Sequence, residues 1–171
     1  MGEDELAAFL EESYDRAYRT AWLIVRDRAD AEEAVQEAYL RVWRFRDALP
    51  DGDDAMRPWL YRVLVNTTLS LLRRERPRIA AVREAAAREP RAVGPADVAV
   101  LDAEASAAVL AAIGDLPEHL RVPVVLRYWS GLTEREIAAA IRRRPGTVKS
   151  RLHEAKRRLA IDGRVAALGA G

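Results

Sequence analysis

Positive charge gathers near the C-terminal end of the chain in a pattern that suits phosphate binding. The stretch from residue 142 to residue 158 holds one acid, Glu154, and eight cations: Arg142, Arg143, Arg144, Lys149, Arg151, Lys156, Arg157 and Arg158. Cations clustered on one surface neutralise DNA phosphates and release their counterions, which supplies much of the affinity for DNA. A helix with a solvated basic face is the ordinary alternative, so the neighbouring residues must distinguish the two.

Those neighbours predict two short helices joined by a sharp turn. Thr133 and Glu136 have the spacing of a capping box, and Leu132 and Ile137 stand where a hydrophobic staple would lie. Pro145 suits the first turn of a second helix. Apolar residues recur at helical spacing on both sides of the turn, at Ile137, Ala140, Ile141, Val148, Leu152, Ala155 and Leu159. Cap, turn and cations together predict a helix-turn-helix that binds DNA.

The rest of the chain separates its charges, although the formal net charge is only +1. Residues 1–56 have a net charge of −8, residues 57–91 of +6, residues 92–118 of −5 and residues 119–171 of +8. Two basic segments predict two surfaces for nucleic acid, and the acidic ones indicate a protein partner or serve solubility alone. The same separation suggests that the free protein packs its domains together, acidic surface on basic.

Several classes of function are excluded by what the sequence lacks. There is no cysteine, the two histidines are far apart, and no glycine-rich phosphate loop or paired metal motif occurs. We therefore expect no catalytic residue, no cofactor, no metal and no small-molecule substrate. The acidic start MGEDELAAFLEE is unlike a signal peptide, and no apolar run approaches the roughly 18 residues of a membrane span. These features predict a soluble, cytoplasmic protein without membrane insertion.

Helical periodicity dominates the chain, and no stretch reads as a strand. Apolar spacing predicts a first helix that ends near residues 26–28, a second helix capped by Asp30, and a third from Pro58 to about Arg76. Further helices are predicted over residues 101–113 and 118–128, and Pro123 should bend the latter. Prolines and alanines mark a linker between them. We predict an all-α fold of two small domains, with boundaries at 1–77, a flexible linker 78–98, 99–161, and a short tail 162–171.

Three motifs stand in order along this chain: DAEEAVQEAYLRVWR (30–44), RPWLYRVLVNTTLSLLRRERPR (57–78) and DLPEHLRVPVVLRYWSGLTEREIAAAIRRRPGTVKSRLHEAKRRL (115–159). Together they resemble the bacterial RNA polymerase sigma factors of the sigma-70 class, in the extracytoplasmic-function (ECF) subgroup. The resemblance implies a sigma domain 2 and a sigma domain 4, the latter a winged-helix-like helix-turn-helix. It also implies binding to core RNA polymerase and promoter DNA, reading of minus-10 and minus-35 elements, assistance in promoter melting, and an anti-sigma factor as a further partner.

The first motif resembles the helix by which these factors bind polymerase. The resemblance assigns that contact to Glu33, Gln36, Glu37 and Leu40. Independently, these four positions form one helical stripe opposite the apolar Val35, Ala38 and Val42, with Phe45 as a further inward candidate. An ordinary solvated helix face is the alternative interpretation of the stripe.

The second motif resembles the segment that reads and melts the minus-10 element. Its polar stripe is Arg62, Asn66, Ser70 and Arg73, which Arg74, Arg76 and Arg78 extend. Asn66 matches the family's asparagine near the base that is flipped from the stack, and residues 50–56 match the loop that forms the pocket of that base. Trp59 and Tyr61 are the aromatic candidates, with Trp59 favoured as a core residue.

The third motif resembles the domain that recognises the minus-35 element. Its candidate contacts are Arg144, Thr147, Lys149, Ser150, Arg151, His153 and Arg157, of which Lys149 and Arg151 can donate to guanine edges. The turn departs from the family in having Arg142–Pro145 where a glycine is usual. The first helix must then end on another C-cap, and phosphate contacts should become stronger and less selective.

A LuxR-type helix-turn-helix regulator is the alternative, since LTEREIAAAI…TVKSRL fits that module too. Such a protein would bind duplex DNA as a dimer without polymerase. The first two motifs oppose it, and no receiver-like alternation of strands and helices precedes the helix-turn-helix.

Overall fold

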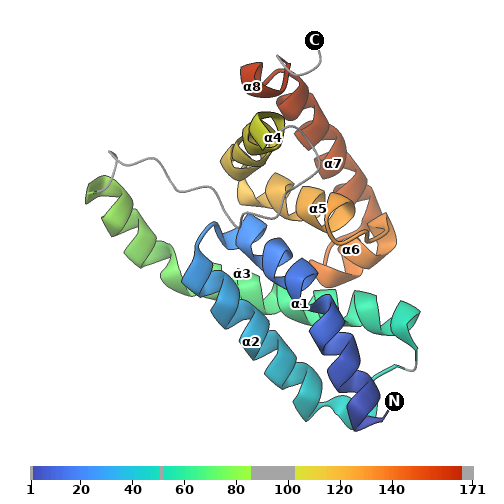
Figure 1. Ribbon diagram of the computed structural model, residues 1–171. Helices are drawn as coiled ribbons and strands as arrows, with labels where there is room; N and C mark the ends of the chain where they lie inside the picture. The colour runs from blue at the N-terminus through green and yellow to red at the C-terminus, as the bar shows by residue number, and fades with distance from the viewer. Residues whose placement is uncertain (1, 51, 86–102, 167–171) are drawn as a thin grey trace.

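The computed structural model describes residues 2–50, 52–85 and 103–166, and every element in these ranges is a helix (Figure 1). Their order is α1 (Glu3–Val25), α2 (Arg28–Arg44), the 3-10 helix η1 (Arg46–Ala48), α3 (Asp53–Ala85), α4 (Ala103–Asp115), α5 (Glu118–Tyr128), α6 (Glu134–Ala140), α7 (Pro145–Ala160) and α8 (Gly163–Ala166). The all-α prediction is confirmed. The described residues contain no strand, and most of the segment predicted as a linker, from residue 86 onward, lies outside them.

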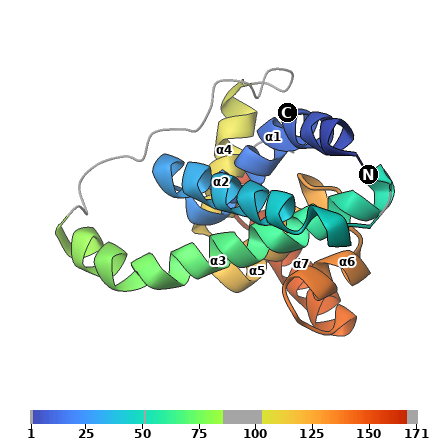
Figure 2. The same cartoon turned by 90° about the horizontal axis from the view of Figure 1, so that it is seen from below.

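Helices α1, α2 and α3 pack on one another as the N-terminal domain (Figures 1 and 2). The inward face of α2 is fully buried and consists of small or β-branched residues: Ala31, Ala34, Val35, Ala38 and Val42. Small side chains let neighbouring helices approach closely. Tyr39 fixes α2 to α1, because its hydroxyl donates to the Leu10 carbonyl at 2.9 Å and is hydrogen-bonded to the Ser13 hydroxyl at 2.8 Å.

The start of α2 differs from the prediction that Asp30 caps it. The N-cap is Asp27, whose Oδ1 accepts the Asp30 amide at 3.1 Å. The cause lies one residue earlier, where Arg26 takes a left-handed conformation (φ 64°) and ends α1 abruptly. Because α1 ends so sharply, the next residue is already extended and can cap the following helix.

Helix α3 is longer at both ends than predicted. It begins at Asp53 rather than near Pro58 and continues through Pro77 to Ala85, past the domain boundary expected at residue 77. Proline is a poor marker here because the residues after it, Arg78 to Ala85, are rich in alanine and arginine, which favour a helix. In consequence residues 53–56 of the predicted pocket loop are helical, and Met56 is completely buried.

Helices α4 to α8 form the C-terminal domain, with α6 and α7 as the helix-turn-helix. The capping box is confirmed: Thr133 Oγ1 accepts the Glu136 amide at 3.3 Å, and Glu136 Oε2 accepts the Thr133 amide at 2.7 Å. Pro145 is the first residue of α7, as expected. In place of glycine, Arg142 takes a left-handed conformation (φ 53°), and the Arg143 amide then donates to the Ala138 carbonyl at 2.9 Å. Pro123 lies buried within α5.

The two domains are in contact in this structure. Helix α1 packs on α5, and α3 packs on α6 (Figure 1). A single apolar cluster runs through both domains and includes Ala21, Ile24, Tyr61, Leu64, Val124, Leu126, Leu132 and Ile137. The contact is therefore largely apolar, whereas the charge pattern suggested acidic surface on basic.

Candidate nucleic-acid and protein interfaces

The predicted stripe on α2 forms an exposed surface opposite a buried face. Glu33 and Gln36 are exposed, Glu37 is half-buried, and Leu40 is 61% exposed. The stripe continues beyond its prediction, because Trp43 and Phe45 add exposed apolar surface at the end of α2. Phe45 was expected to point inward and is instead 56% exposed, since α2 ends at Arg44 and the helical repeat no longer applies. Exposed apolar side chains grouped in this way are typical of protein contacts.

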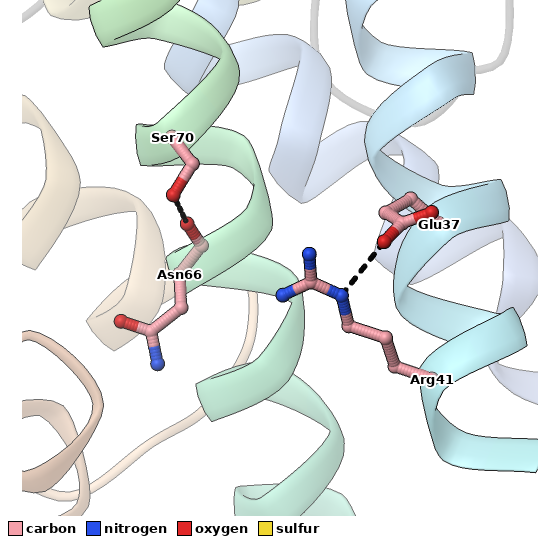
Figure 3. Close-up of polar contacts among 4 residues, drawn as sticks. All are labelled: Glu37, Arg41, Asn66 and Ser70. Carbon is pink, nitrogen blue, oxygen red and sulfur yellow. Dashed lines mark hydrogen bonds and ion pairs between the residues drawn. The ribbon is translucent and has the colours of Figure 1, made fainter. Parts of the chain in front are cut away.

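The acids of the α2 stripe are engaged in surface ion pairs. Glu37 Oε1 accepts a hydrogen bond from Arg41 Nε at 2.8 Å (Figure 3), and Glu33 Oε1 accepts one from Arg74 Nη2 at 3.0 Å. Both pairs are about half exposed, so water screens them and each contributes less than about 1 kcal/mol. They can exchange partners at little cost. The second pair joins a predicted polymerase contact to a predicted DNA contact on α3.

The predicted stripe on α3 is polar, and several of its side chains donate hydrogen bonds to backbone carbonyls of the same helix. Arg62, Ser70 and Arg73 are exposed, and Asn66 is half-buried. The side-chain amide of Asn66 donates to the Arg62 backbone carbonyl at 2.7 Å. The Ser70 hydroxyl donates to the Asn66 backbone carbonyl, also at 2.7 Å (Figure 3). Arg73 Nε likewise donates to the Leu69 carbonyl at 3.0 Å. Because a net hydrogen bond is worth only about 0.5–1.5 kcal/mol, these groups can turn outward to a ligand.

The remaining α3 residues that were predicted to contact DNA differ in how exposed their side chains are. Arg74 is exposed, whereas the side chains of Arg76 and Arg78 lie outside the described residues. Tyr61 is 1% exposed and belongs to the core, so its interpretation as a base-stacking residue is wrong. Trp59 is half-buried and packs against a small apolar cluster of Leu6, Leu10, Val42, Met56 and Leu60.

Helix α7 presents its cations away from its buried face. Val148, Leu152 and Ala155 are buried, while Lys149, Ser150, His153 and Arg157 are exposed and Thr147 and Arg151 are half-buried. Arg144 is the exposed N-cap, so a cation stands beside the amide groups that begin α7. Glu154 Oε1 accepts a hydrogen bond from Arg158 at 2.7 Å, and the Lys156 ammonium lies 5.9 Å from the centre of the Tyr128 ring. The predicted contacts thus share the outward side of one helix.

Neither a membrane-spanning helix nor a metal site is found in the described part of the chain. Within residues 2–50, 52–85 and 103–166, no helix is long and apolar enough to cross a membrane. In the same ranges, no group of three or more histidine, aspartate or glutamate side chains is arranged to hold a metal ion.

Comparison with known proteins identifies the class. The family described as "Sigma-70 region 2" matches residues 9–78, and the one described as "Sigma-70, region 4" matches residues 106–159. The chain is 35% identical to the ECF RNA polymerase sigma-E factor of Escherichia coli over 145 residues, which cover 80% of this chain and 74% of that protein. It therefore belongs to the sigma-70 family of RNA polymerase sigma factors. Within that family its relatives place it in the ECF group.

A second relative and two solved structures agree with this assignment. The chain is 34% identical to the ECF sigma factor SigE of Mycolicibacterium smegmatis over 146 residues, 85% of this chain but only 56% of that longer protein. The sigma factor RpoE, solved in complex with the anti-sigma factor NepR from Bartonella quintana, has a TM-score of 0.71 and 26% identity over 94% of this chain and 97% of its own. CnrH, solved in complex with the cytosolic domain of CnrY, shares the fold, with a TM-score of 0.63 and 19% identity over 99% and 90%. The findings support the sigma-factor interpretation and not the LuxR-type alternative.

Proposed function

We propose that this chain binds core RNA polymerase and directs it to promoters by reading minus-10 and minus-35 elements and assisting in melting. One observation carries the proposal. Three helices of a sigma-70 chain, α2, α3 and α7, each present an exposed stripe of the chemistry that one of these tasks requires.

Helix α2 supplies the polymerase contact through Glu33, Gln36, Glu37 and Leu40. Leu40 offers apolar surface that is free to be buried, and the weakly paired acids can turn to cations of a partner. Trp43 and Phe45 extend this surface toward η1. Desolvated apolar and aromatic side chains contribute most of the affinity of protein interfaces, so the leucine is the expected anchor.

Helix α3 supplies the minus-10 contact through Arg62, Asn66, Ser70, Arg73, Arg74 and Arg76. The arginines neutralise backbone phosphates and so favour the strand that melting exposes. The Asn66 amide has both a donor and an acceptor, which suits it to the edge of an unstacked base. Among the described residues, the Asn66 side chain makes one hydrogen bond, to the Arg62 carbonyl of its own helix, and a base edge would replace that bond.

Helix α7 supplies the minus-35 contact through Arg144, Thr147, Lys149, Ser150, Arg151, His153 and Arg157. An α-helix fits the major groove, where Lys149 and Arg151 can donate to guanine O6 and N7. The turn residues Arg142 to Arg144 are exposed and lie at the start of α7, where they can contact the DNA backbone and fix its register.

The remaining parts of the proposal follow from the family. The chain acts in the cytoplasm as a subunit that catalyses nothing itself and needs no cofactor. An anti-sigma factor is a further partner, by the precedent of the sigma factor RpoE solved in complex with the anti-sigma factor NepR. The domain limits that we propose are 1–77 for sigma domain 2, 78–98 for the linker, 99–161 for sigma domain 4 and 162–171 for the tail.

The experiment is a selection of bound DNA from a genomic fragment library. Core polymerase would be mixed with the fragments alone, with the chain, or with variants Asn66→Ala and Lys149→Ala. We expect fragments sharing a two-element motif only when the chain is present. The first variant should lose selection at the downstream element and the second at the upstream one. Selection of the same motif without core polymerase would contradict the proposal and favour an independent regulator.

A further inference from the structure

A hollow opens between α1 and α3, on the side of α3 that faces away from its minus-10 stripe. Its volume is about 230 Å³, and the residues that line it are Phe9, Glu12, Ser13 and Arg16 of α1 and Arg57, Leu60 and Tyr61 of α3. At 3.6 residues per turn, Tyr61 stands only about 40° from Arg57 around α3. The stripe residues Arg62 and Asn66 stand roughly 140° and 180° from Arg57. The hollow therefore belongs to the N-terminal domain alone and shares no residue with the proposed promoter contacts.

Two arginines line this hollow without a partner in the described part of the chain. No hydrogen bond or ion pair to another described residue engages the guanidinium of Arg16 or that of Arg57. The Nε of Arg57 is moreover buried, and no described residue accepts from it. A buried donor without an acceptor is costly, because it has given up water for nothing. A ligand that brings acceptor oxygens into the hollow would remove that cost.

The hydroxyl of Tyr61 is a second buried donor at this place. The side chain is buried, and its hydroxyl makes no hydrogen bond within the described residues. The hydroxyls of Thr20 and Ser130 lie near it but are too poorly aligned to accept from it. Burial raises the pKa of the Tyr61 phenol, and the positive charges of Arg16 and Arg57 oppose that rise, so both guanidinium groups act on this hydroxyl. The phenol therefore keeps its proton at neutral pH and can donate it to a bound oxygen.

The other walls limit what the hollow can hold. The Ser13 hydroxyl already donates to the backbone of its own helix at 3.0 Å and is hydrogen-bonded to the Tyr39 hydroxyl at 2.8 Å. Half-buried Phe9 and buried Leu60 supply an apolar side. Glu12 is exposed, and its carboxylate lowers the charge of the two arginines to a net +1. The hollow thus combines a cationic side with an aromatic one.

We propose that this hollow binds the phosphate of a nucleotide, held between the guanidinium groups of Arg16 and Arg57 with the Tyr61 hydroxyl as a further donor. The planar fork of a guanidinium matches the oxygens of a phosphate, and two forks can bind one phosphate from two sides. The volume is smaller than the roughly 300–1,000 Å³ of pockets for drug-sized molecules, so it takes the phosphate with part of the attached group. Phe9 offers a ring on which a base can stack.

The first test is calorimetric titration of the full chain with adenosine monophosphate, with adenosine, and with a single-stranded oligothymidylate. Arg16→Gln and Arg57→Gln should each weaken binding of adenosine monophosphate at least about fivefold, because each removes a charge-assisted contact. Arg28→Gln is the matched control, since Arg28 is an exposed cation at the far end of α1, on the first turn of α2, and should leave the Kd unchanged. Adenosine, which lacks the phosphate, should bind at least about tenfold more weakly.

The two sources of such a phosphate give different results. Binding of adenosine monophosphate that is lost in Arg16→Gln and Arg57→Gln supports the site and identifies a free nucleotide. Binding of the oligothymidylate alone, weakened by these two variants and not by Arg28→Gln, supports the site and identifies a nucleotide within a strand. Failure of both ligands to bind, or equal weakening by all three variants, would overturn the proposal.

Glu12→Gln gives a prediction of the opposite sign, which a damaged fold cannot imitate. Removing this carboxylate raises the net charge of the lining residues from +1 to +2. We expect the ligand that binds the wild-type chain to bind the variant at least about threefold more tightly, because a repulsion between like charges is removed. An unchanged or weaker affinity, at unchanged helix content by circular dichroism, would contradict an anion at this place.

Chemical protection locates the ligand in the unaltered chain. Phenylglyoxal modifies accessible guanidinium groups, and mass spectrometry of peptides reports the rate at each arginine. At a saturating concentration of the bound ligand we expect modification of Arg16 and Arg57 to slow at least about threefold, while Arg28 reacts as before. Equal rates at all three arginines with and without ligand would overturn the proposal. The measurement needs no polymerase, so it decides this site whether or not the proposed promoter function holds.

Discussion

Leu40 provides the sharpest test of the proposed polymerase contact, because its side chain is available for binding but contributes little to the fold. Complete burial of a leucine side chain is worth about 1.5–3 kcal/mol. At 61% exposure, roughly three fifths of this remains to be gained on docking, so Leu40→Ala should cost about 1–2 kcal/mol of binding free energy. That corresponds to a Kd about 5- to 30-fold weaker. The free energy of unfolding should change by less than about 0.5 kcal/mol, as for other surface substitutions.

The assay is a titration of labelled core polymerase with the wild-type chain and the variant, alongside urea unfolding of each. Ile161→Ala is the matched control, since Ile161 is an exposed branched aliphatic residue (84%) just beyond the end of α7. Its substitution should leave the Kd unchanged. A wild-type Kd for Leu40→Ala, or equal weakening by both variants, would refute the assignment of the α2 stripe to polymerase.

Four further predictions concern other parts of the molecule. Lys149→Ala should cost about 1–3 kcal/mol of binding free energy to minus-35 duplex DNA and relax the sequence preference at one base pair, whereas Arg158→Ala, which removes a cation paired with Glu154, should leave that preference intact. Competition binding with point-substituted duplexes measures both variants, and equal relaxation by the two would contradict the assignment of Lys149 to base contact. Asn66→Ala should reduce open-complex formation on duplex promoters more than on pre-melted ones, by permanganate footprinting, and equal loss on both would show that it does not act in melting. Thr133→Ala removes the capping box of α6 and should destabilise the chain by about 1 kcal/mol, seen as a lower midpoint of unfolding in urea. An unchanged midpoint would mean that the cap does not contribute to stability. Burial raises the pKa of the Tyr39 phenol from 10.0 to about 12, so the contribution of this phenol to stability is complete below pH 10 and is lost as the pH rises toward 12. In unfolding experiments at a series of alkaline pH values, the free energy of unfolding should decline less for Tyr39→Phe than for the wild-type chain, and identical declines would refute this prediction.

The features that the sequence predicted well depend on neighbours along the chain. Thr133 and Glu136 meet because a capping box spans one helical turn, and Pro145 begins α7 because its fixed φ suits a first turn. The stripe that contains Leu40 follows in the same way from the helical repeat. Family membership and the all-α fold class rested on such local patterns, repeated over three motifs.

The features that were missed depend on contacts between distant parts of the chain. The hydrogen bond between Thr20 and Ser130 joins positions 110 residues apart, and no local pattern indicates it. Tyr61 is an aromatic residue next to the polar stripe of α3, yet packing between the domains makes it part of the core. Phe45 is exposed because α2 ends just before it, and that end is a property of the three-dimensional fold rather than of apolar spacing.

The central claim is that this chain gives core RNA polymerase its choice of promoter. The most direct measurement maps transcription start sites in vitro on a genomic fragment library, using core polymerase with and without the chain. We predict new starts only in its presence, each downstream of a shared pair of sequence elements. No new starts, together with no binding of the chain to core polymerase, would contradict the claim.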